Sequence, residues 1–157
     1  MGARGDKFGA VTFNNSCVHE ETMFASFKFK HRSGHVRCVD EPSANSKWGC
    51  TTKTFDGCLA MLITDEENNV LFPKKRLTQF RDVYNLDLYY EIPTFDQNSD
   101  VFVLSDFTSP LSVEQGKTLR VWYSEDLTEN PSSKDNHGTV CFDLYALVVL
   151  PPHHIYR

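Results

Sequence analysis

The feature that most limits how this chain can fold is a period of two in its apolar residues. From Met23 to His31 the sequence MFASFKFKH places Ala25, Phe27 and Phe29 at alternate positions, with polar side chains after Ala25 and Phe27. Residues two apart lie on one face of a strand, whereas one face of a helix needs spacings of three and four. The segment therefore predicts a strand with one buried face.

Similar segments recur along the chain, and none has the apolar spacing of an amphipathic helix. Cys58 to Thr64, CLAMLIT, is a continuous apolar run, which is typical of a buried central strand. Ser33-Gly34 predicts a turn that pairs the first strand with 35–39 in a hairpin. Further strands are predicted at 70–72, 87–92, 101–105, 111–113, 118–123 and 139–150, with one helical turn at most between 72 and 84. We therefore predict an all-β fold, an antiparallel two-sheet sandwich of jelly-roll type.

The length and composition fit one globular domain. The chain has 157 residues, of which 40% are hydrophobic and 13% aromatic, too many for a disordered protein. Residues 1–10 are predicted to be a flexible tail, 11–150 the β-sandwich domain and 151–157 a C-terminal tail.

Several classes of protein are disfavoured. A formal net charge of -5 gives no case for nucleic acid binding, and no apolar run reaches the roughly 18 residues of a membrane span. The start MGARGDKFGA has no hydrophobic core, so we expect no signal peptide in this chain. No GxSxG elbow or recognisable cysteine-protease context is present, and we do not expect an enzyme.

The cysteines bear on the compartment. Cys38 and Cys50 flank a polar segment that reads as a loop, and a disulfide closing it would contribute roughly 3 kcal/mol. The alternative is that all five cysteines are buried and reduced. Five is an odd number, so at least one thiol lies outside any intrachain pair. Together with a glycosylation sequon at Asn14, the pattern favours an extracellular protein.

The closing segment from Arg120 to Leu150 predicts a hairpin around an acidic loop. Asp126, Asp135 and Asn136 would meet across that loop, and Ca²⁺ prefers carboxylate and amide oxygens. We therefore predict a calcium site there, with a solvated acidic turn as the alternative. In the same hairpin, Asp143 is expected to pair with Arg120 across the strands.

Three aromatic side chains are candidates for sugar binding, because sugar C–H faces stack on rings. They are Trp48, within a polar loop, and Trp122 and Tyr123, adjacent on one strand. The alternative is that these rings belong to the core.

Arg4-Gly5-Asp6 matches the tripeptide that integrins bind, in a segment expected to be exposed. The alternative interpretation is a chance match.

The closing segment also resembles a known group of domains. RVWYSEDL at 120–127 and DNHGTVCFDLYAL at 135–147 are similar to the closing hairpin of secreted β-sandwich domains of marine invertebrates, known especially from corals and other cnidarians. FASFKFKHRSGHVRC at 24–38 and SKWGC at 46–50 resemble the same group. The resemblance implies a secreted adhesive, matrix or lectin-like module, without an assigned activity.

The sequence thus predicts an extracellular binding module of lectin-like or adhesive type, with or without calcium, whose partner is a glycan or an extracellular protein. The competing interpretations are an oligomerising structural or matrix protein without a small ligand, and a capsid-like jelly roll.

Overall fold

The computed structural model describes residues 1–13, 22–83, 86–127 and 131–149, and shows an all-β sandwich. All the paired strands are antiparallel, which confirms the predicted fold class. The strands are β1 Gly9–Thr12, β2 Met23–Arg37, β3 Met61–Thr64, β4 Val70–Phe72, β5 Gln79–Val83, β6 Leu86–Glu91, β7 Val101–Ser105, β8 Leu111–Ser112, β9 Thr118–Tyr123 and β10 His137–Val149. The short helical turns are η1 Pro42–Ala44, η2 Lys75–Leu77, α1 Ser124–Leu127 and η3 Pro131–Asp135.

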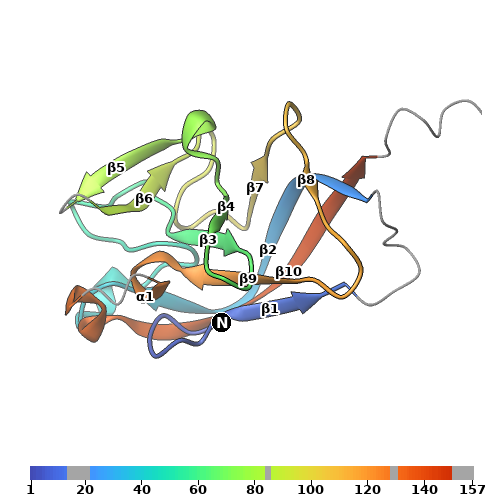
Figure 1. Ribbon diagram of the computed structural model, residues 1–157. Helices are drawn as coiled ribbons and strands as arrows, with labels where there is room; N and C mark the ends of the chain where they lie inside the picture. The colour runs from blue at the N-terminus through green and yellow to red at the C-terminus, as the bar shows by residue number, and fades with distance from the viewer. Residues whose placement is uncertain (14–21, 84–85, 128–130, 150–157) are drawn as a thin grey trace, which may run out of the picture.

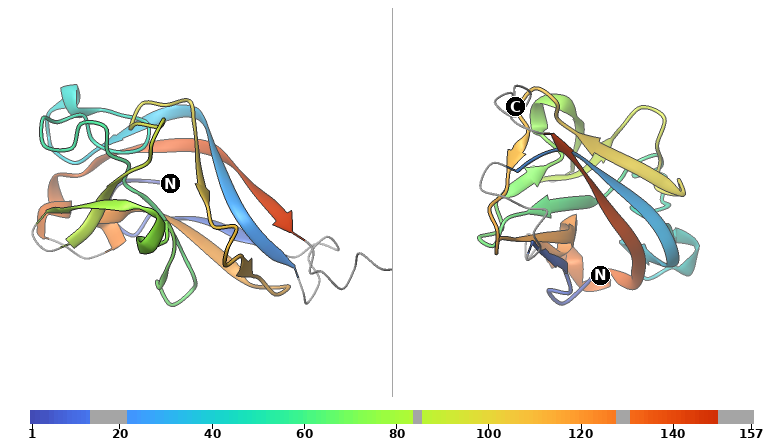
Figure 2. Two further views of the ribbon diagram at one scale, coloured as in Figure 1. Left: turned by 90° about the horizontal axis from the view of Figure 1, so that it is seen from above. Right: turned by 90° about the vertical axis from the view of Figure 1, so that its right-hand side faces the viewer.

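Two sheets form the sandwich, and a small hairpin accompanies them (Figure 1). One sheet has the order β1-β9-β3-β4, and the other has the order β10-β2-β7, with β8 also paired to β2. β5 and β6 form the separate hairpin. The long strands β2 and β10 run side by side through most of their length (Figure 2). Among the described helices, none is long and apolar enough to cross a membrane.

The burial pattern follows the apolar pattern of the sequence. In β2, Phe27 and Phe29 are buried while Lys28 and Lys30 are exposed, as the period of two predicts. All four residues of β3 are buried, as expected for a continuous apolar run inside a sheet. The ring of Phe29 stacks on Phe102 of β7 at 4.4 Å between centroids. The core between the sheets is therefore rich in aromatic rings.

The N-terminal residues differ from the prediction of a flexible tail. β1 pairs with β9, and Gly2 forms a bridge with Thr139 at the start of β10. Ala3 is fully buried, and its backbone N–H donates to the carbonyl oxygen of Gly138 at 3.1 Å. Backbone pairing with β9 and β10 thus orders this segment, although its small and charged residues had predicted a flexible tail. The predicted tail 151–157 and the Asn14 sequon lie outside the described residues.

Both predicted hairpins were wrong. β2 continues through Ser33-Gly34 to Arg37, because β10 pairs with it on both sides of a bulge in the ladder. β9 and β10 lie in different sheets, so the segment 120–150 crosses the sandwich instead of folding back on itself. Asp143 consequently pairs with Arg32 of the neighbouring strand and not with Arg120.

Candidate functional site

The connection between β9 and β10 contains the predicted metal ligands, and it is folded into α1 and η3. Ser124, Glu125 and Asp126 of α1 are buried, and so is Asn136 directly before β10. Asp135, at the end of η3, is half-buried. Carboxylates are seldom buried unless they are paired. Asp126 and Asn136 therefore do not belong to a solvated acidic turn, which was the alternative interpretation.

The two carboxylate oxygens of Asp126 have different surroundings. Oδ1 accepts a hydrogen bond from the backbone N–H of Gly5 at 2.8 Å. Oδ2 is buried and has no hydrogen-bond partner among the described residues. Burial raises the pKa of Asp126, although backbone N–H groups of Gly5 and Lys7 act in the opposite direction. A buried carboxylate oxygen without a donor is unfavourable unless a cation or a proton reaches it.

Two other polar side chains of this connection share this condition. Oδ1 of Asp135 and Oδ1 of Asn136 are also buried without a hydrogen-bond partner in the described part of the chain. Such carboxylate and amide oxygens are the type of ligand that Ca²⁺ takes in sets of six to eight. Within the described ranges, however, no three His, Cys, Asp or Glu side chains gather in a way that could hold a metal. A calcium ion here would need carbonyl, amide or water oxygens in addition to the two aspartates.

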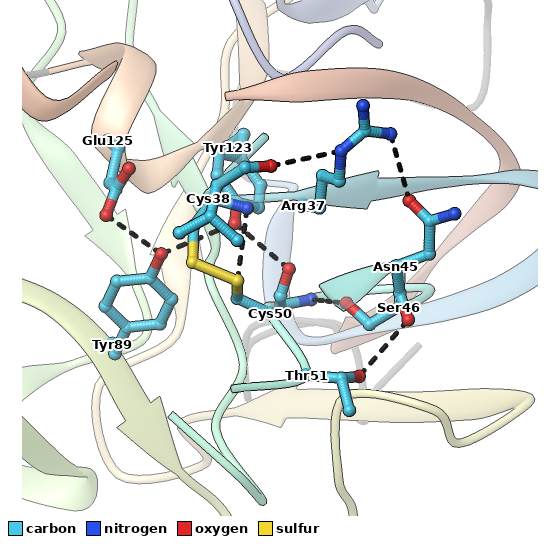
Figure 3. The surroundings of a disulfide bond; sticks show 11 residues. Arg37, Cys38, Asn45, Ser46, Cys50, Thr51, Tyr89, Tyr123 and Glu125 are labelled. Atoms are coloured by element: carbon cyan, nitrogen blue, oxygen red, sulfur yellow. Dashed lines mark hydrogen bonds between the residues drawn. A yellow bond between two sulfur atoms is a disulfide. The ribbon is translucent and has the colours of Figure 1, made fainter. Parts of the chain in front are cut away.

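Glu125 belongs to a polar cluster inside the core (Figure 3). Its Oε1 accepts a hydrogen bond from the Tyr89 hydroxyl at 2.9 Å, and the Tyr89 and Tyr123 hydroxyls lie 3.4 Å apart. Tyr123 in turn donates to the carbonyl oxygen of Gly49 at 3.0 Å. Burial raises the pKa of Glu125, while the hydrogen bond from Tyr89 lowers it. This cluster joins α1 to the loop before β3 and is shielded from ligands.

An open hollow of about 400 Å³ lies between the N-terminal turn and the start of β10. Its lining is polar and consists of Arg4, Gly5, Lys7, Asn136, His137, Gly138 and Thr139. Asn136 therefore belongs both to this hollow and to the group of unpaired buried oxygens. Its volume falls within the range of small-ligand sites, but its lining is more polar than that of most such sites.

Sequence reasoning found Asn136 but missed the other residues that line this hollow. Residues 2–7 and 136–139 meet because Gly2 pairs with Thr139 and the Ala3 N–H donates to the Gly138 carbonyl oxygen. His137 has a further distant partner, since its Nε2 lies 2.6 Å from Oδ1 of Asp40. Such pairing between the two ends of the chain leaves no local pattern in the sequence.

A second hollow of about 260 Å³ lies near the β3–β4 turn and β8. Its lining combines apolar side chains of Leu71, Leu111, Val113 and Leu119 with Asp65, Glu66, Glu67, Glu114 and Lys117. It contains none of the predicted ligand-binding or metal-binding residues.

The three predicted sugar-stacking rings lie in the core. Trp48 and Tyr123 are 0% exposed and Trp122 is 4% exposed. Trp48 donates from Nε1 to the Ser99 carbonyl oxygen at 2.6 Å, and Trp122 donates from Nε1 to Thr64 Oγ1 at 3.1 Å. Their burial contradicts the predicted stacking role. The polar residues next to Trp48 in the sequence suggested an exposed ring, but the loop that carries Trp48 folds over the core.

The predicted Cys38–Cys50 disulfide is confirmed, with the two Cα atoms 5.6 Å apart (Figure 3). Cys58 is a buried thiol and Cys141 an exposed one on β10. Cys17 lies outside the described residues. The alternative of five reduced cysteines is therefore wrong for this pair.

Comparison with known proteins gives one structural likeness. No protein-family model and no curated protein sequence matches the chain. Among solved structures, the chain is similar to AJLec from the sea anemone Anthopleura japonica, with a TM-score of 0.78 and 29% sequence identity. The match covers 93% of this chain and 89% of that one. The likeness supports the all-β sandwich over nearly the entire chain.

Proposed function

We propose that this chain is an extracellular binding module that recognises glycans in the manner of a lectin. The observation that carries the proposal is the similarity to AJLec, whose name marks it as a lectin, over nearly the whole chain. The Cys38–Cys50 disulfide supports an extracellular setting, because disulfides persist in oxidising compartments. A role in binding and not in catalysis, and membership of the cnidarian group of secreted domains, are parts of the same proposal.

The glycan site that we propose is the hollow between the N-terminal turn and β10. Arg4 and Lys7 offer N–H donors, His137 offers its second ring nitrogen, and Thr139 offers a hydroxyl that both donates and accepts. Sugar hydroxyls likewise donate and accept, so a monosaccharide would find partners on several sides. The volume of about 400 Å³ suits one or two sugar rings at the end of a glycan.

Calcium assistance is the finer part of the proposal. Asp126, Asp135 and Asn136 each have a buried oxygen without a partner among the described residues, and these oxygens would hold the ion. Because Asn136 also lines the hollow, an ion on that side chain would lie next to a bound sugar. The ion would supply a fixed positive charge and would offset the cost of burying the Asp126 carboxylate.

A glycan array tests the site. Lys7→Ala and His137→Ala change side chains that are not fully buried, so both variants should fold. We expect both to lose most of the retention that the wild type shows. Lys117→Ala, at the second hollow, is the matched control and should bind as the wild type does. If Lys117→Ala loses retention and the other two variants keep it, the glycan site is the second hollow. If the wild type retains no glycan, the lectin proposal is refuted.

Thermal melting with Ca²⁺ or with EDTA tests the metal. We expect Ca²⁺ to raise the melting temperature of the wild type, because an ion that binds only the folded state stabilises it. Asp135→Ala should remove that increase, whereas Glu66→Ala, an exposed carboxylate elsewhere, should keep it. Equal melting of the wild type in the two buffers would remove calcium from the proposal.

A structural or matrix role is the second candidate function. The observation that favours it is the exposure of large apolar side chains near the end of β10, where Tyr145, Leu147 and Val148 are 45%, 50% and 44% exposed. Exposed apolar patches often mark protein contacts. A defined homo-oligomer in light scattering, without any glycan retained, would support this role over the lectin role.

A further inference from the structure

The integrin-type tripeptide Arg4-Gly5-Asp6 lies at the tip of a tight N-terminal turn. The turn is closed by a hydrogen bond of 2.8 Å from the Gly2 backbone N–H to the Lys7 carbonyl oxygen. Ala3 is fully buried and is bound to Gly138, so one arm of the turn is fixed to β10. The tripeptide therefore lies on a folded element.

The backbone conformation at the tip is stabilised by its own residues and by Asp126. Gly5 has a φ of 79° and Asp6 a φ of 55°, both in the left-handed region. Glycine and aspartate are among the residues that adopt this region most readily. The buried Asp126 accepts the Gly5 N–H at 2.8 Å. Local residue preference and a distant hydrogen bond thus favour the same loop conformation.

The two charged side chains of the tripeptide are exposed and unused within the protein. Arg4, Gly5 and Asp6 are all exposed. Neither the Arg4 guanidinium nor the Asp6 carboxylate forms an ion pair or a side-chain hydrogen bond with any described residue. A cation and an anion two residues apart are therefore available to a partner at the same time.

We propose that this turn is an adhesion site for an integrin-type receptor. The partner must offer carboxylates to the guanidinium of Arg4, which binds them in a bidentate manner. It must also offer a divalent cation, which accepts the Asp6 carboxylate as a ligand. Because the folded domain already holds the turn, less conformational entropy is lost on binding than for a free peptide.

The site is separable from the proposed glycan site. Arg4 and Gly5 line the hollow, but Asp6 does not. Substitutions at Asp6 therefore test receptor binding without removing a group from the glycan site, and the two proposals can fail independently.

The test is binding of the intact chain to the purified ectodomain of an integrin of the class that binds this tripeptide, in Mn²⁺. Two variants keep the fold, because Asp6 is exposed: Asp6→Asn removes the charge and suits the left-handed backbone, and Asp6→Glu keeps the charge but lengthens the side chain. We expect both to reduce affinity at least about tenfold while glycan retention is unchanged. EDTA or a cyclic peptide carrying the same tripeptide should abolish binding of the wild type.

A linear peptide of residues 2–7 measures the contribution of the turn. We expect the intact domain to bind at least about tenfold more tightly than the peptide, because the peptide must first be ordered. No binding of the wild type in Mn²⁺, or binding that survives Asp6→Asn, would overturn the adhesion site. Equal affinity of peptide and domain would overturn the role of the folded turn.

Discussion

Removal of the Cys38–Cys50 disulfide should destabilise the fold strongly while leaving both proposed binding sites intact. The cysteines are 12 residues apart, and closing a loop of that size stabilises the folded state by roughly 3 kcal/mol in the chain-entropy model. The sulfur atoms are also buried, so Cys38→Ala with Cys50→Ala leaves a small cavity that adds to the loss. For a chain of this length, we expect a fall in Tm of roughly 6–12 °C.

Urea unfolding of the double variant, followed by tryptophan fluorescence, measures this loss. Trp48 lies inside the closed loop and is fully buried, so its emission reports directly on that region. Cys141→Ala changes an exposed thiol and is the matched control, with an expected change below about 0.5 kcal/mol. A loss below about 1 kcal/mol for the double variant would refute the reasoning, since it would mean that packing alone holds the loop.

Three further predictions concern burial and backbone geometry. Glu125→Gln should be more stable than the wild type at pH 7 and equal to it below about pH 4. Burial raises the pKa of Glu125 in the folded state, so its ionisation at higher pH favours unfolding. Urea titrations of both proteins between about pH 4 and pH 7 measure the difference in their free energies of unfolding. Gly138→Ala should lower the free energy of unfolding by about 3 kcal/mol, because the added Cβ would lie 2.2 Å from the His35 carbonyl oxygen. Gly116→Ala, also at positive φ but in open space, should lower it by about 1 kcal/mol. Alkylation of the native protein, read by peptide mapping, should label Cys141 but not Cys58, and equal labelling would contradict the burial of Cys58.

The strands and their buried faces could be predicted because burial follows local alternation. Phe27 and Phe29 face the core, and the run at 61–64 is buried on both sides, as the sequence indicates. Which strands pair could not be predicted in the same way. The segment 124–136 reads as a turn because it is polar, yet it carries the chain from one sheet to the other. One oxygen of Asp126 and one of Glu125 accept hydrogen bonds from the distant residues Gly5 and Tyr89, and local patterns do not reveal such partners.

The candidate site, too, could be predicted only in part from the sequence. The sequence identified Asp126, Asp135 and Asn136 from their oxygen-bearing side chains, and these residues do lie in one buried polar segment. It did not place Arg4 and Lys7 beside Asn136, because that position depends on pairing of the N-terminal residues with β10. Composition therefore indicated the type of chemistry, whereas topology determined which residues surround it.

Asp126 connects the two proposals through its two oxygens. Oδ1 holds the Gly5 N–H of the adhesion turn, and Oδ2 has no partner among the described residues. A calcium ion on Oδ2 would keep Asp126 ionised, and an ionised carboxylate is the stronger acceptor for the Gly5 N–H. Calcium binding and ordering of the turn would then stabilise each other, because coupling between two sites is reciprocal. Hydrogen exchange at the Gly5 amide should therefore slow when Ca²⁺ is added, and it should not respond to Ca²⁺ in Asp135→Ala. If Ca²⁺ stabilises the wild type but does not change exchange at the Gly5 amide, the ion binds without contacting Asp126.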